Sequence, residues 1–142
     1  MANSPTVPEP RNFFDDDRDL HAVLGRIAPD ALDRWRGHLS EFGAWVAGEV
    51  DAQADHTHRH APPVLEAYDG DGRLTNRIRL NPAWREVSRR VYEHGVVGLN
   101  HGDDPAPFAI TFAMGYVLAQ ADISLHCPVT MTGAVAYVLD RF

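Results

Sequence analysis

The sequence predicts an all-α, mainly helical chain with a short irregular segment and a β-turn in its middle. Apolar residues recur at three- and four-residue steps over residues 29–54, which is the period of a helix with one buried face. Asn81 and Pro82 then form a helix-start signal, because Asn accepts from free amides and Pro fits the first helical position. Two apolar stretches, at 108–119 and 127–139, are shorter than the roughly 20 residues that cross a bilayer. We therefore expect two core helices there and no membrane partner.

Length and composition predict one domain. The 142 residues are 44% apolar, which is enough for a real core. A formal net charge of −7 argues against a nucleic-acid partner, since phosphate binding needs clustered cations. Cys127 is the only cysteine, so an internal disulfide is excluded and a cytoplasmic location is expected. Residues 1–11 are rich in Pro and small polar residues and predict a disordered leader, with the folded domain at 12–142.

The first part of that domain predicts two helices. Three carboxylates at residues 15–17 precede a short apolar-periodic segment, where negative charge favours a helix N-terminus. In the longer helix at 29–54, Trp35 and Leu39 lie one turn apart on the same face. Both side chains are expected in the core.

The middle, residues 55–80, predicts an irregular connection. Pro62-Pro63 excludes a helix there, and the run from Tyr68 to Gly72 contains Asp-Gly turn signals. Short extended pieces are expected on either side, at 64–67 and 78–80.

The last helices follow from glycines and from apolar runs. The helix that begins after Asn81 is expected to end at Gly95 or Gly98. The two apolar helices are expected to separate near residues 124–127, with the Phe112 side of the first one packed in the core.

Two features could be reactive, a group of three histidines and a single cysteine, and neither is expected to have a catalytic or metal-binding role. In an extended chain His56, His58 and His60 would share one face, and in a helix only His56 and His60 would do so. Imidazoles suit Zn²⁺, Cu²⁺ or Ni²⁺, but Arg59 lies among them and no thiol is near, so we predict a surface loop and no metal site. Cys127 is expected to pack as a small hydrophobic residue, and no catalytic residue is predicted.

Several ordered motifs resemble the N-terminal domain of the acyl-CoA dehydrogenase superfamily, most of all its adaptive-response, AidB-like branch. The resemblance covers roughly residues 49–142 and departs at Asn81, where a His before the Pro is more usual. The motifs are Pro62-Pro63-Val64-Leu65-Glu66-Ala67-Tyr68-Asp69, Gly72-Arg73, Ile78, Asn81-Pro82-Ala83-Trp84 and the late run His126-Cys127-Pro128-Val129-Thr130-Met131-Thr132-Gly133-Ala134.

The resemblance implies a part of an FAD-dependent enzyme that dehydrogenates acyl-CoA thioesters. In such enzymes a helical N-terminal domain closes one side of the acyl pocket. A β-domain and a C-terminal bundle, neither of which is in these residues, hold most of the FAD and usually the catalytic Glu. The expected partners are an acyl-CoA-type substrate and either further copies of the chain or a second polypeptide that carries the flavin domain.

By the same resemblance, the helix before Cys127 lines the acyl channel. Val117, Gln120, Ala121 and Ser124 fall at helical steps on one face, and we predict that they bind substrate. The alternative is that this face only packs against another helix. For the whole chain the alternative is a non-catalytic helical binding or scaffold module that keeps the fold without redox activity.

Overall fold

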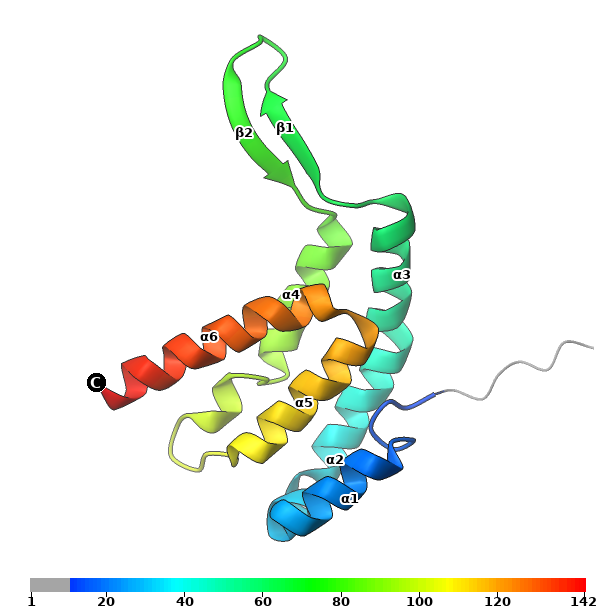
Figure 1. Cartoon of the computed structure of the whole chain (residues 1–142), viewed down its shortest axis with the longest axis vertical. Helices are drawn as coiled ribbons and strands as arrows, with labels where there is room; N and C mark the ends of the chain where they lie inside the picture. The colour runs from blue at the N-terminus through cyan, green and yellow to red at the C-terminus, as the bar shows by residue number, and fades with distance from the viewer. Residues whose placement is uncertain (1–10) are drawn as a thin grey trace, which may run out of the picture.

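A computed structural model describes residues 11–142 and confirms a mainly helical chain with one small sheet. The leader predicted at residues 1–11 lies, apart from Arg11, outside the described residues, and the domain bounds stay a prediction. The elements in chain order are α1 (Arg18–Ile27), α2 (Pro29–Trp45), the π-helical turn η1 (Val46–Val50), α3 (Asp51–His60), β1 (Val64–Tyr68), β2 (Leu74–Arg79), α4 (Pro82–Glu93), the 3₁₀ turn η2 (Gly98–Asn100), α5 (Phe108–Ala121) and α6 (Ile123–Arg141) (Figure 1).

α2, η1 and α3 form one continuous rod, so the predicted helix end near Ala54 is wrong. Buried residues recur every fourth position at Phe42, Val46, Val50 and Ala54. In an α-helix of 3.6 residues per turn this series would rotate away from the core, and the wider π-turn brings it back. The rod ends at His60, just before the two prolines.

β1 and β2 form an antiparallel hairpin that stands away from the helices (Figure 1). The turn between them is built by Asp69, whose Oδ1 accepts from the amides of Asp71 and Arg73 at 2.9 Å each. Gly72 has a φ of 80°, which favours glycine. The predicted turn and extended pieces are thus confirmed, with both strands longer than expected.

The predicted starts of α1 and α4 are confirmed. The Asp17 side chain accepts from the amide of Leu20 at 2.8 Å and caps α1, while Asp15 instead accepts from Ser40 Oγ at 2.6 Å. The Asn81 side chain accepts from the amide of Ala83 at 3.0 Å and caps α4. These bonds satisfy donors that a helix leaves free at its first turn.

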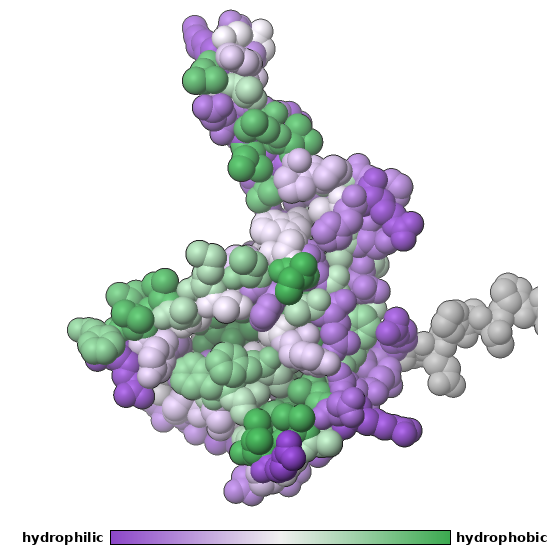
Figure 2. All heavy atoms as spheres, viewed as in Figure 1, coloured by the Kyte–Doolittle hydropathy of each residue, from purple (hydrophilic) through white to green (hydrophobic). Residues whose placement is uncertain are grey.

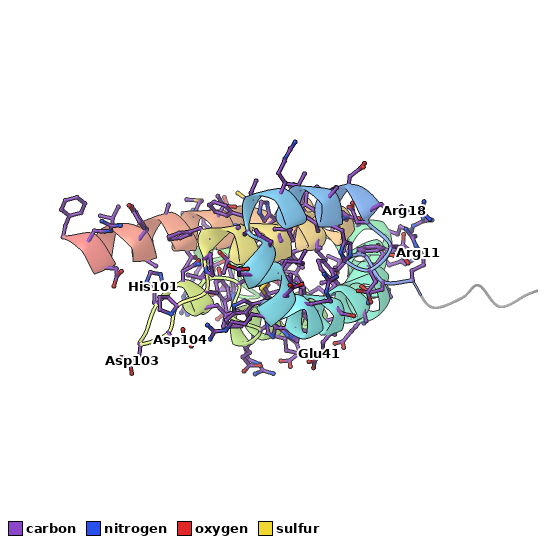
Figure 3. The ribbon with its side chains drawn as sticks, turned by 90° about the horizontal axis from the view of Figure 1, so that it is seen from below. Arg11, Arg18, Glu41, His101, Asp103 and Asp104 are labelled. Carbon is purple, nitrogen blue, oxygen red and sulfur yellow. The ribbon has the colours of Figure 1, made fainter. Side chains whose placement is uncertain are left out.

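α5 lies at the centre of the helices and packs against α1, α2 and η1. The loop before it is joined to α2 by Arg34, which donates from Nη1 to Asp104 Oδ1 at 3.2 Å. Figure 3 shows this loop, with His101, Asp103 and Asp104, at one side of the helices. The pairing raises the pKa of Arg34 and lowers the pKa of Asp104, through the hydrogen bond first and the opposite charge second.

The break between α5 and α6 is at Asp122, so its predicted place near residues 124–127 is wrong. Asp122 caps α6 by accepting from the amide of Ser124 at 2.8 Å. Its side chain is buried, and its other oxygen, Oδ2, has no hydrogen-bond partner among the described residues. Pro128 consequently lies inside α6, where it leaves the carbonyl four residues earlier without a helical donor.

Candidate functional site

The candidate site is a groove between α5 and α6, referred to below as the α5–α6 groove. The two helices diverge from their junction at Asp122, and the space between them has a volume of about 980 Å³. Figure 2 shows the hollow, with apolar residues around it. Pockets that bury a drug-sized ligand measure about 300–1,000 Å³, so this groove can hold a ligand of that size.

Both helices line the groove along much of their length. From α5 come Phe108, Thr111, Phe112, Gly115, Tyr116 and Ala119. From α6 come, among others, Ile123, His126, Thr130, Gly133, Tyr137 and Arg141. The lining is mainly apolar, with charge at Arg141.

The groove lies on the side of α5 that was expected in the core. Phe112 is 72% exposed and Ile123 is 66% exposed, whereas Met114 and Val117 are fully buried. The expectation that the Phe112 side packs inside is therefore wrong. α5 is apolar nearly all round, so hydrophobicity alone does not distinguish its two faces.

Polar side chains in the groove lining already have hydrogen-bond partners within the chain. Thr111 Oγ1 donates to Asn100 Oδ1 at 2.7 Å, and Asn100 Nδ2 donates to the carbonyl of Ala106 at 2.9 Å. A polar group that already has its partner does not require one from a ligand. These residues therefore leave the groove suited to an apolar occupant.

Near the junction, α5 and α6 approach closely because Gly115 has no side chain. A Cβ added at Gly115 would lie 2.8 Å from Nε2 and 3.2 Å from Cδ2 of His126. The imidazole of His126 thus occupies the place of a side chain on α5. Its Nε2 atom also lies 3.3 Å from Thr130 Oγ1, one turn along α6.

Away from the junction, aromatic residues and one cation border the groove. The rings of Phe108 and Tyr137 meet edge to face with centroids 5.7 Å apart. The guanidinium carbon of Arg141 lies 5.3 Å from the centroid of the Tyr137 ring. This end therefore presents a positive charge beside an apolar surface.

The four residues predicted to bind substrate lie elsewhere on α5 and at the start of α6. Val117 is fully buried, Ala121 is half-buried and Gln120 is exposed. Ser124 is exposed, and its Oγ accepts from Trp84 Nε1 at 3.4 Å. None of the four borders the groove, and their role in substrate binding stays a prediction. The signal that identifies the groove face is the recurrence of aromatic residues every fourth position at 108, 112 and 116.

The histidine cluster lies on α3, so its assignment to a loop is wrong. The rings of His56 and His60 are neighbours with centroids 5.5 Å apart, whereas His58 Nε2 is 3.6 Å from Asp122 Oδ1. Within residues 11–142, no three His, Cys, Asp or Glu side chains are placed to hold one metal ion. Whether this cluster binds a metal stays a prediction.

Cys127 is exposed on α6, so the expectation that it packs as a small hydrophobic residue is wrong. Over the same described residues, no helix is both long and apolar enough to cross a bilayer.

Tyr116, which borders the groove, and His94, which is half-buried, have shifted pKa values. The pKa of Tyr116 is raised, first because its hydroxyl hydrogen-bonds to the Asp17 carboxylate and second because that carboxylate is negative. The pKa of His94 is lowered, first by burial and then by the nearby His38 and Arg90. His94 stacks on Trp45 with centroids 4.5 Å apart, outside the groove.

Comparisons with known proteins give a consistent family. The family described as the adaptive response protein AidB N-terminal domain matches residues 3–141. Acyl-CoA dehydrogenase family member 11 of Caenorhabditis elegans is 29% identical in an alignment 140 residues long, which covers 93% of this chain and 22% of that protein. The putative acyl-CoA dehydrogenase AidB of Escherichia coli (strain K12) is 31% identical over 80 residues, which are 55% of this chain and 15% of that protein.

A solved structure shares the fold. The crystal structure of Caenorhabditis elegans ACDH-11 in complex with C11-CoA superposes with a TM-score of 0.77 at 21% identity. The match covers 99% of this chain and 25% of that one. The chain thus spans about a quarter or less of the length of each of these relatives.

Proposed function

This chain belongs to the family of AidB N-terminal domains, and from that premise we propose that its α5–α6 groove forms one wall of an acyl-binding pocket in an acyl-CoA dehydrogenase-like flavoprotein. The observation that carries the proposal is an apolar groove of about 980 Å³ with a cation at one end. The relative ACDH-11 was solved in complex with C11-CoA, which supports an acyl-CoA-type ligand.

The groove suits an acyl chain for two physical reasons. Burial of apolar surface is worth roughly 25 cal/mol per Å², and exposed rings such as Phe112 and Tyr116 provide that surface. Arg141 provides a charge for the anionic part of a ligand that would remain outside.

Acyl-CoA dehydrogenases are generally FAD-dependent, but the residues of the groove do not fit FAD. A flavin dinucleotide carries two phosphates, which proteins hold with several amide donors or cations. Among the described residues the groove lining has one cation, Arg141. We therefore place FAD outside these residues in the proposed flavoprotein, and no reaction step is assigned to this chain.

Exposed apolar residues on α6, outside the groove lining, support a polypeptide partner. On α6, Met131 is 66% exposed and Leu139 is 77% exposed, and exposed patches of this kind mark interaction sites. The proposed partner is a polypeptide segment that carries the flavin domain, whether in the same chain or another, or a further copy of this chain. Light scattering of the purified chain tests for self-association, and a flavin-containing partner is tested by co-purification.

Isothermal titration of the chain with lauroyl-CoA tests the acyl-binding role. Binding is expected for the unaltered chain and is expected to weaken at least tenfold in Ala134→Trp, which fills the groove. Ala44→Trp, at an exposed position on α2, is the matched control and should bind as the unaltered chain does. Equal binding by both variants would show that the groove is not the acyl site.

A further inference from the structure

The α5–α6 groove has two unlike ends. At the junction end, α5 and α6 are close together, and the imidazole of His126 lies directly over Gly115. At the other end the helices are apart, and Arg141 is exposed beside Tyr137. A charged headgroup loses its hydration in a narrow apolar space, so it is favoured at the wide end.

This polarity fixes the direction of an acyl chain. Its anionic or thioester end belongs near Arg141, where water and a positive charge are available. Its methyl end points toward the junction, along the apolar side chains that line the groove. The imidazole of His126 is then the group that the methyl end reaches.

We propose that His126, held over Gly115 at the junction end of the groove, sets the maximum length of the acyl chain that the groove accepts. The inference rests on the proposed function and adds a specificity-determining residue to it. One contact and one free space fix the position of the ring. Nε2 lies 3.3 Å from Thr130 Oγ1, and the absence of a Cβ at Gly115 leaves the space that the ring occupies.

Gly115 makes the proposal testable from the opposite helix. In Gly115→Ala the new methyl group would lie 2.8 Å from His126 Nε2, closer than real Cβ contacts allow. The ring is the flexible end of a side chain, so it shifts while the helix backbone stays. In Gly115→Ala, movement of the ring away from α5 takes it into the groove and shortens the groove. In His126→Ala the ring is removed and the groove becomes longer.

The experiment measures affinity against chain length. Saturated straight-chain fatty acids of increasing length displace a dansyl-labelled fatty acid from the 142-residue chain, and displacement is followed by fluorescence. Each methylene that enters the groove contributes about 0.8 kcal/mol, or about fourfold in affinity. The gain per methylene should vanish at the length that reaches His126, which gives the plot a break.

The break is expected at longer chains in His126→Ala and at shorter chains in Gly115→Ala. His126→Gln keeps a polar side chain of intermediate size. Its break should fall between that of His126→Ala and that of the unaltered chain. Ala134→Val, in the wall away from the junction, is the control and should change affinity by one factor at all lengths. Circular dichroism establishes that each variant keeps its helices.

The outcomes separate the two proposals. Displacement without any dependence on chain length overturns the acyl-binding function and this inference with it. A length-dependent break that stays in place in both His126→Ala and Gly115→Ala overturns the inference alone and leaves the groove as an acyl site. Shifts in opposite directions in these two variants support it.

Discussion

The two faces of α5 are both apolar and have different surroundings. On one face, Ile110, Met114 and Leu118 are fully buried against the other helices. On the other, Phe112 and Tyr116 are half or more exposed and border the α5–α6 groove. A helix that is apolar all round is normally buried all round.

The difference teaches that such a helix requires two sets of partners. The buried face has its partners in α1, α2 and η1 of the same chain. For the exposed face, the proposed partners are an acyl ligand and a flavin-bearing segment. Stability measurements should distinguish the two faces, because only the first already contributes to the folded chain.

Truncation on the buried face should have the largest effect. Met114→Ala removes a fully buried side chain and is expected to lower the free energy of unfolding by about 2–5 kcal/mol. Phe112→Ala, two residues away on the groove face, is expected to lower it by less than about 1 kcal/mol. Urea denaturation of both variants measures the contrast. Equal losses would mean that the groove face is packed in the free chain.

Added volume should give a smaller contrast of the same kind. Gly43→Ala places a Cβ 2.7 Å from the backbone nitrogen of Phe14, so backbone must move, and we expect a loss of about 1–3 kcal/mol. Ala134→Leu adds more volume but points into the groove, and its effect should stay within about 0.5 kcal/mol. A Gly43→Ala chain as stable as the original would contradict the packing of α2 against residues 12–14.

The dependence of stability on pH should be the smallest effect. The pKa of His94 is lowered from its ordinary value of 6.5, so the unfolded chain binds more protons than the folded chain at pH values between the folded and unfolded pKa. The stability contribution of neutral His94 is therefore present above about pH 6.5 and is lost as the pH falls toward the folded pKa. Urea denaturation above and below pH 6.5 measures this loss of stability.

Two variants relate this pH effect to the faces of α5. His94→Gln should lose the part of the dependence that belongs to His94, since it removes the titrating group. Phe112→Ala should keep the pH dependence of the unaltered chain, because Phe112 borders the groove and His94 lies outside it. A His94→Gln chain with an unchanged pH profile would assign the effect to other residues.

Local signals in the sequence predicted much of the fold. Asp17 and Asn81 cap helices as their chemistry requires, and the Asp-Gly run builds the hairpin turn. These predictions succeeded because each depends on a few neighbouring residues. The π-turn η1 depends on which residues of a long helix face the core, which is a property of the tertiary structure.

The site was harder to predict than the fold. The family resemblance selected the helix before Cys127, and the helix-spacing argument then selected the face that carries Val117, which is buried in the core. Spacing identifies a face only when the opposite face is polar. The break at Asp122 was missed for a related reason, since Pro128 suggested an interruption that the helix tolerates.

The β1–β2 hairpin has a consequence for local stability. Among the described elements, its strands make extensive contacts only with each other, and Leu65 and Ile78 form an exposed cross-strand pair. A two-stranded hairpin alone is marginally stable in water. Its amide hydrogens should therefore exchange with solvent through local opening that leaves the helices intact, and a partner that docks on it would be detected as slowed exchange there before any change in the global unfolding.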